Sequence, residues 1–214
     1  NEFEIAVAIL CNVKILHGLE LEELLDGIMG NGGDEGIDLC YIFSNGLLIK
    51  DDEFSLNRES SVKVIFFQIK KEESFSTDGI RKLKEGIEEI FNLELDLDHL
   101  RHIGANSDLL RQADLIRKVF RSSRRNLAKF SCEVFYATIA TNTEVATKIK
   151  HIEANLINNS LSIPMKVEYW GAQKLLDLAS EGEESLEIRF DSQPLNIAEK
   201  DIKISGFAGF VNGN

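Results

Sequence analysis

The sequence contains few of the residues that build disulfide frameworks and zinc sites. Only three of its 214 residues are cysteine and four are histidine. The cysteines, Cys11, Cys40 and Cys132, lie in apolar contexts without CxxC spacing, and their odd number argues against a set of disulfides. The histidines have no metal-ligand spacing either. We therefore expect reduced, buried cysteines in a cytoplasmic protein.

Signals for several other classes of protein are also missing. No apolar run approaches the ~20 residues that span a bilayer, and the N-terminal stretch lacks the basic start and cleavage site of a secretory signal. The glycine-rich GNGGDEG is not followed by the GKS or GKT of a P-loop, and there is no Ser–His–Asp elbow. These absences argue against a membrane protein, a P-loop nucleotidase and a serine hydrolase.

The chain is acidic overall but has one basic segment. The formal net charge of −12 by itself argues against nucleic-acid binding. Residues 101–130, however, carry eight Lys or Arg against two acidic residues. Arg117, Arg121 and Arg124 recur at i, i+4 and i+7 of a predicted helix, with Arg125 beside them. This face is predicted either to contact nucleic-acid phosphates or to be solvated and paired with acidic surface.

The apolar pattern predicts an α/β fold. The strand SVKVIFFQIK (61–70) is apolar on both faces, so we expect it in the centre of a sheet with helices on each side. In the second half of the chain helices and strands alternate, as in α/β folds. Predicted strands cover residues 37–43, 61–70, 130–140 and 165–170, and predicted helices cover residues 1–16, 19–29, 75–93, 106–129, 141–158 and 171–180.

The domain organisation and two helix starts can also be predicted. Ser76 or Thr77 is available to cap the helix that follows the central strand, and Asn142 or Thr143 to cap the helix near residue 141. Residues 1–180 are predicted to form one domain. We expect the acidic segment after it, 181–214, to connect this domain to a C-terminal region outside this chain.

Polar residues interrupt two predicted strands near one end of the sheet. Asp38 lies near the start of one strand, and Gln68 and Lys70 close the next on a shared face. If the strands are neighbours, a divalent cation such as Mg²⁺ could bind the Asp38 carboxylate, the Gln68 amide oxygen and the Ile69 backbone carbonyl. Lys70 would orient a water or stabilise developing negative charge. Taken singly, Asp38 could instead serve the turn, and Gln68 and Lys70 could be a solvated strand end.

An aspartate that opens one strand and a Q-x-K that closes the next resemble the Mrr-like branch of the PD-(D/E)xK nuclease superfamily. Members often carry a glutamate on the first helix, where FEIAVAIL offers Glu4. More narrowly, GGDEGIDLCYIF, FFQIKK and VEYWGAQKLLDL resemble the N-terminal domain of the abortive-infection phage-resistance (AIPR) proteins of bacteria. The resemblance covers roughly residues 1–180. It implies a restriction-endonuclease-like fold, a central mixed sheet flanked by helices on both faces.

The resemblance also implies a Mg²⁺- or Mn²⁺-dependent DNA endonuclease of anti-phage defence. Glu4 and Asp38 would bind the cation, Gln68 would complete the pocket and Lys70 would assist the attacking water. Gln68 stands where the superfamily usually has an acid, so the site has one negative charge fewer and Glu4 becomes more important. Two alternatives stay open: a weakened nuclease-fold module that binds nucleic acid or a partner protein, and a scaffold that forms a homodimer.

Overall fold

The computed structural model describes residues 2–30, 32–158, 162–181, 195–198 and 205–208. Its contacts divide the chain into two units, Asn1–Gly182 and Glu183–Asn214. The second unit contains a two-stranded antiparallel sheet, β6 (Leu195–Ala198) with β7 (Ser205–Ala208). The predicted connecting role of residues 181–214 stays a prediction, because most of that segment lies outside the described residues.

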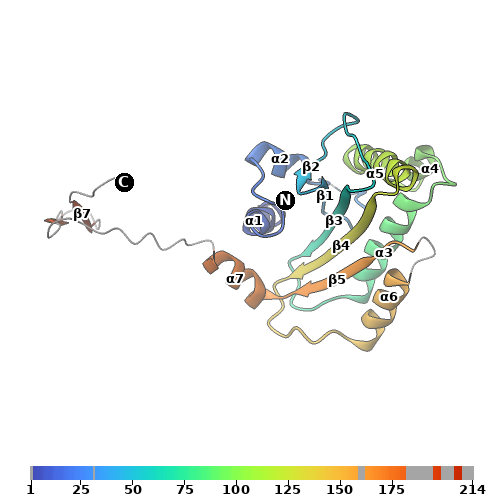
Figure 1. The fold of residues 1–214 in the computed structure, drawn as a ribbon. Coiled ribbons are helices and arrows are strands. Elements are labelled where there is room, and N and C mark those ends of the chain that lie inside the picture. Colours follow the sequence, from blue (N-terminus) through green and yellow to red (C-terminus); the bar gives the residue numbers. More distant parts are fainter. Residues whose placement is uncertain (1, 31, 159–161, 182–194, 199–204, 209–214) are drawn as a thin grey trace. The chain divides into compact units, whose positions relative to one another are not determined.

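The first unit is built on a five-stranded sheet with the order β2-β1-β3-β4-β5 (Figure 1). β1 (Leu39–Ser44) pairs antiparallel with both β2 (Leu47–Leu48) and β3 (Ser61–Lys70). β4 (Lys129–Thr138) and β5 (Met165–Trp170) extend the sheet on the other side of β3 in parallel. The sheet is therefore mixed, and the prediction that residues 61–70 form its central strand is confirmed.

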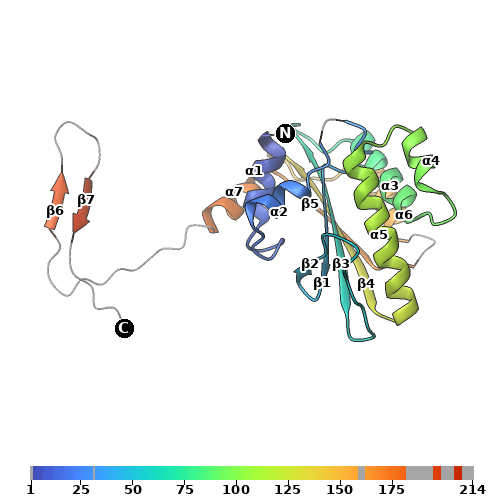
Figure 2. The same ribbon diagram turned by 90° about the horizontal axis from the view of Figure 1, so that it is seen from above.

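Helices cover both faces of this sheet. Figure 2 shows α3, α4, α5 and α6 on one side of the sheet and α1, α2 and α7 on the other. Their bounds are α1 (Glu2–Cys11), α2 (Leu21–Asp26), α3 (Thr77–Phe91), α4 (Leu97–His102), α5 (Ser107–Asn126), α6 (Thr147–Ile157) and α7 (Ala172–Glu181). In the described part of the chain, each helix is too short or too polar to cross a membrane. The α/β architecture is as predicted and is compatible with a restriction-endonuclease-like fold.

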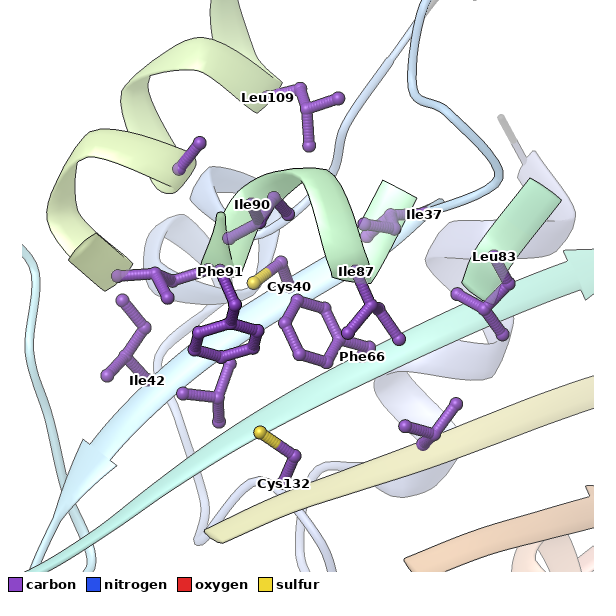
Figure 3. Packing of buried hydrophobic residues seen from close by; sticks show 14 of the residues in the cluster. Ile37, Cys40, Ile42, Phe66, Leu83, Ile87, Ile90, Phe91, Leu109 and Cys132 are labelled. Carbon is purple, nitrogen blue, oxygen red and sulfur yellow. The ribbon is translucent and has the colours of Figure 1, made fainter. Parts of the chain in front are cut away.

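Two apolar cores hold the helices to the sheet. Even-numbered residues of β3, such as Phe66, face the larger core, which includes Ile87 and Phe91 of α3 (Figure 3). Odd-numbered residues, such as Phe67, face a second core beneath α1 and α7, which includes Cys11. A fully buried Phe or Ile side chain contributes about 1.5–3 kcal/mol to the stability of the fold. The three cysteines are free and buried, as predicted.

Helix starts follow local hydrogen bonding, and one predicted start is wrong. Ser76 caps α3, since its hydroxyl accepts a hydrogen bond from Gly79 N–H (3.0 Å). The predicted cap of the later helix, Asn142 or Thr143, does not form. Asn142 Oδ1 accepts a hydrogen bond from Glu144 N–H (2.9 Å) and closes a turn, and α6 begins only at Thr147. α1 and α2 also end before residues 16 and 29, where the sequence pattern placed their ends.

Candidate functional site

The backbone around Asp38 departs from the regular β-ladder. Leu39 is the β1 residue that pairs with Phe67 of β3, yet the Asp38 N–H also donates to the Phe67 carbonyl (2.8 Å). Two successive residues thus face one residue of the partner strand, which is the arrangement of a β-bulge. The Asp38 carbonyl accepts a hydrogen bond from Met29 N–H (2.9 Å). The bulge is fixed from both sides and sets the direction of the Asp38 side chain.

The Asp38 carboxylate is buried and bonded at the end of β3. Its Oδ2 accepts a hydrogen bond from Ile69 N–H at 2.6 Å, so the side chain takes the place of a ladder carbonyl beyond the last β1 pair. Lys70 Nζ lies 3.5 Å from the same oxygen. Asp38 is 5% exposed, whereas Lys70 is 34% exposed. The structure therefore brings together the carboxylate and the ammonium that the sequence placed at one end of the sheet. We call this end, where β1 begins and β3 ends, the rim.

Gln68, two residues before Lys70 in β3, is fully buried. In the described residues, neither its Nε2 nor its Oε1 has a hydrogen-bond partner. A buried polar group left unpaired costs about 1–3 kcal/mol, so such groups are rare unless something else satisfies them. Space beside Gln68 depends on Gly36, because a Cβ at that position would lie 3.0 Å from Nε2 and 2.8 Å from Leu83 N. Gly36 also has a φ of +78°, which favours glycine.

Two other carboxylates, Asp34 and Glu4, act on the charge of Asp38. Burial raises the pKa of the Asp38 carboxyl to about 6, the Ile69 N–H and the Lys70 ammonium oppose this rise, and the charges of Asp34 and Glu4 add to it. Glu4, on the first turn of α1, is thus close enough to act on Asp38 electrostatically. Like charges near a carboxylate disfavour its ionised form, and the Lys70 ammonium offsets part of this effect.

The donor set available to a cation is mixed. Among the described residues, no group of three or more His, Cys, Asp or Glu side chains has the geometry of a metal site. The ligands that the sequence predicts are instead all oxygen donors: two carboxylates, Asp38 and Glu4, the Gln68 amide oxygen and the Ile69 carbonyl. Oxygen donors suit Mg²⁺ and Mn²⁺. The unpaired Oε1 of Gln68 fits this group, because a ligated cation would satisfy it.

Asp34 and Gly36 were not singled out as site residues by the sequence. The Asp34 Oδ1 accepts a hydrogen bond from Gly36 N–H (2.8 Å) in the turn before β1. Asp34 is half-buried, and its charge raises the pKa of Asp38. The stretch GGDEG signals a turn, but nothing in it shows that the turn folds back against Gln68.

The structure contradicts one member of the predicted nucleic-acid face. Arg117 is buried, and its guanidinium donates to the carbonyls of Ile90 (2.8 Å), Leu95 (2.8 Å) and Glu89 (2.9 Å). It cannot contact a phosphate, and this prediction is wrong. The physical reason is that the end of α3 and the following turn fold over this part of α5, where orphan helix carbonyls need donors.

Arg121, Arg124 and Arg125, by contrast, are exposed on the last turns of α5. Arg124 lies over the Phe120 ring, 5.0 Å from its centroid, which holds the guanidinium at the surface. These three residues remain candidates for phosphate contact. The likeness of the sequence to Mrr-like and AIPR proteins also stays a prediction, because comparison of the chain with family models, curated proteins and solved structures found no match.

Proposed function

We propose that this chain carries a metal-dependent DNA endonuclease domain that hydrolyses phosphodiester bonds in the anti-phage defence of bacteria. The observation that supports it most is the rim where β1 begins and β3 ends. There a buried carboxylate, an ammonium 3.5 Å away and a buried amide with no partner lie on adjacent residues or strands. A salt bridge that served only stability would not need the unpaired amide of Gln68 beside it.

The residues that would hold Mg²⁺ or Mn²⁺ are Asp38, Glu4, Gln68 through Oε1 and Ile69 through its carbonyl. A bound cation supplies a water of lowered pKa and neutralises charge on the phosphoryl group. The charges of Glu4 and Asp34 act on Asp38 together and favour a cation there, whereas the Lys70 ammonium opposes one. The Ile69 N–H and the bulge hold the Asp38 carboxylate in place before any ligand arrives, so little ordering is needed on binding.

Lys70 would act on the reacting phosphate. Its side chain is about one-third exposed, and within the described part of the chain Nζ is held by one ion pair, of 3.5 Å. The ammonium can therefore turn toward a scissile phosphate or its attacking water without losing a short hydrogen bond. A positive donor aimed at the charge that develops on phosphoryl oxygens is a major source of catalysis in such sites.

Replacing Lys70 tests this role. We expect Lys70→Ala to lower Mg²⁺-dependent cleavage of DNA by about 10²–10³-fold, the usual loss when one charge-stabilising donor is removed. The matched control is Lys63→Ala, which removes a lysine from the other end of β3, where it pairs with Glu133 (2.7 Å). Cleavage is followed on a labelled duplex. Equal activity of the Lys70 variant and the wild type would exclude the proposed site.

Replacing Gln68 tests the cation. We expect Gln68→Glu to lower the Mg²⁺ concentration for half-maximal cleavage by about tenfold, because ligand charge tunes cation affinity. Without Mg²⁺ the added buried charge should lower Tm, and Mg²⁺ should restore it by binding the folded state. Gln112→Glu, at a buried glutamine on α5, is the control. It should lose stability equally with and without Mg²⁺, and the same behaviour at Gln68 would contradict a cation at this position.

A second candidate is a nuclease-fold module that binds nucleic acid without cutting it. It is favoured by one observation, that Asp38 already has Ile69 N–H and Lys70 as partners. Cleavage assays with Mg²⁺ and with Mn²⁺ separate the two candidates, since this module would retain DNA and leave it intact.

The exposed arginines of α5 should increase DNA affinity under both candidates. We expect Arg121→Ala, Arg124→Ala and Arg125→Ala together to weaken DNA binding and to make its salt slope shallower, by about 0.9 for each phosphate that is no longer neutralised. Binding is measured by fluorescence anisotropy over a salt series in EDTA. Arg101→Ala, at an exposed arginine that pairs with Asp98, is the control. An unchanged salt slope in the triple variant would show that these arginines do not contact DNA phosphates.

A further inference from the structure

β5 is the last strand of the five-stranded sheet in the part of the chain that the structure describes. Its backbone N–H and C=O groups point alternately toward β4 and away from it. Cys132 N–H donates to the Pro164 carbonyl (2.9 Å), and Cys132 pairs with Met165 in the parallel ladder. In such a ladder alternate residues face the neighbouring strand. Lys166 and Glu168 therefore turn their N–H and C=O toward β4. Met165, Val167 and Tyr169 turn theirs toward the open edge.

The side chains of β5 alternate in the same way. Met165, Val167 and Tyr169 are partly buried and pack against the larger core. On the opposite face, Lys166 and Glu168 form an ion pair of 2.5 Å, with side chains 70% and 33% exposed. The edge thus carries an apolar row on one face and one positive and one negative charge on the other. Those charges are placed symmetrically about Val167.

We propose that β5 pairs antiparallel with β5 of a second copy of this chain, about a two-fold axis at Val167. In that register Val167 faces Val167, and Met165 faces Tyr169 of the other copy. Each of these pairs exchanges two N–H···O=C bonds, because the residues involved are those whose polar groups point outward. Open sheet edges are templates for this kind of pairing.

Charge complementarity selects the same register. With the axis at Val167, Lys166 of each copy lies opposite Glu168 of the other, and opposite charges in cross-strand positions are favourable. An axis at Met165 would place Lys166 opposite Pro164, and an axis at Tyr169 would place Glu168 opposite Trp170. An axis at Lys166 or Glu168 would centre the pairing on residues whose N–H and C=O already face β4. Of these axes, only the one at Val167 both forms the backbone hydrogen bonds and places Lys166 opposite Glu168.

This pairing goes beyond the proposed nuclease function and does not depend on it. It joins two five-stranded sheets into one continuous sheet. Because β3 and β5 run in the same direction, their C-terminal ends lie at one rim. Because the paired β5 strands run in opposite directions, the rims of the two copies lie at opposite ends of the joined sheet. Two candidate sites in one dimer would face away from each other and act on separate stretches of substrate.

Sedimentation velocity of the 214-residue chain, from about 1 to 100 µM, a range suited to transient pairing, tests the proposal. We expect a concentration-dependent dimer that Val167→Pro weakens at least tenfold. Proline is tolerated on an open edge, so the fold should be retained, which circular dichroism checks. Lys166→Glu should also weaken the dimer, and Lys166→Glu with Glu168→Lys should restore it, because the exchanged charges are again opposite. Lys148→Glu, on exposed α6 surface, should change nothing.

Amide hydrogen exchange supplies a second readout. We expect the amides of Val167 and Tyr169 to become protected as concentration rises, while those of Lys166 and Glu168 are protected throughout by β4. A strict monomer at 100 µM would overturn the proposal. So would a dimer that is insensitive to Val167→Pro and to the charge reversals, because it would use another surface, such as the exposed Val13 and Leu176 of the opposite helical layer.

Discussion

At pH 8 the Asp38→Asn variant is expected to be more stable than the wild-type protein and to have lost metal-dependent cleavage. The Asp38 carboxyl has a pKa of about 6, against 3.8 for an unperturbed aspartate. That difference corresponds to roughly 3 kcal/mol of cost for keeping the charge in the folded state. Asparagine keeps an oxygen to accept the Ile69 N–H but carries no charge, so it avoids this cost and no longer attracts a cation.

The sign of the pH dependence follows from the raised pKa. Between about pH 4 and 6 the folded protein holds the Asp38 proton more tightly than the unfolded chain does, so wild-type stability falls as pH rises. The advantage of Asp38→Asn should be near zero at pH 4, grow to about pH 6 and then stay level. Urea unfolding at several pH values measures it. Asp177→Asn, on the exposed face of α7, should stay within about 0.5 kcal/mol of the wild type. An advantage independent of pH would contradict the buried charge.

Arg117→Ala is expected to destabilise the fold by about 3–5 kcal/mol, the largest effect of any substitution on α5. The guanidinium satisfies the carbonyls of Glu89 and Ile90 in the last turn of α3 and of Leu95 just beyond it. Removing it leaves the buried Ile90 carbonyl without this donor. The part-buried carbonyls of Leu95 and Glu89 each lose a donor as well, although Asn92 N–H still donates to Glu89 (3.3 Å). Arg117→Lys should recover only part of the loss, because one ammonium cannot reproduce the planar fork of donors. Urea unfolding of both variants measures the effect.

Arg121→Ala is the control for this prediction, since it removes an exposed arginine one turn along the same helix. Its effect on stability should lie within about 0.5 kcal/mol. For DNA binding the order of the two variants should be reversed, because Arg121 is exposed and Arg117 is not. Arg117→Ala, measured where it is still folded, should bind DNA as the wild type does. Equal stability of the two variants would show that the carbonyl contacts of Arg117 contribute little.

The sequence predicted the fold where short-range patterns decide it. The two apolar faces of residues 61–70 required a central position, and Ser76 had the right spacing to cap α3. The meeting of Asp38 with Lys70 followed because strands adjacent in sequence tend to pair. The burial of Gln68 could not be predicted, since it depends on the turn at Gly36 packing beside α3.

The error at Arg117 has a similar cause. Arg117 does share a helix face with Arg121 and Arg124 at i, i+4 and i+7. The spacing does not show, however, which part of that face other elements cover. The α4 helix and the turn before it were not predicted from the sequence, and Leu95 in that turn is one of the acceptors that bury Arg117. The burial of Arg117 therefore depends on long-range packing, which helical periodicity does not predict.

The position of β3 between an antiparallel and a parallel neighbour has a consequence for the order of folding. Phe67 meets Leu39 over a short stretch of chain, whereas Ser61 meets Lys129, 68 positions further on. Closing the longer loop costs more chain entropy and limits the rate. The hairpin that carries Asp38 and Lys70 can therefore assemble on a growing polypeptide before the segments that shelter its other side have been synthesised.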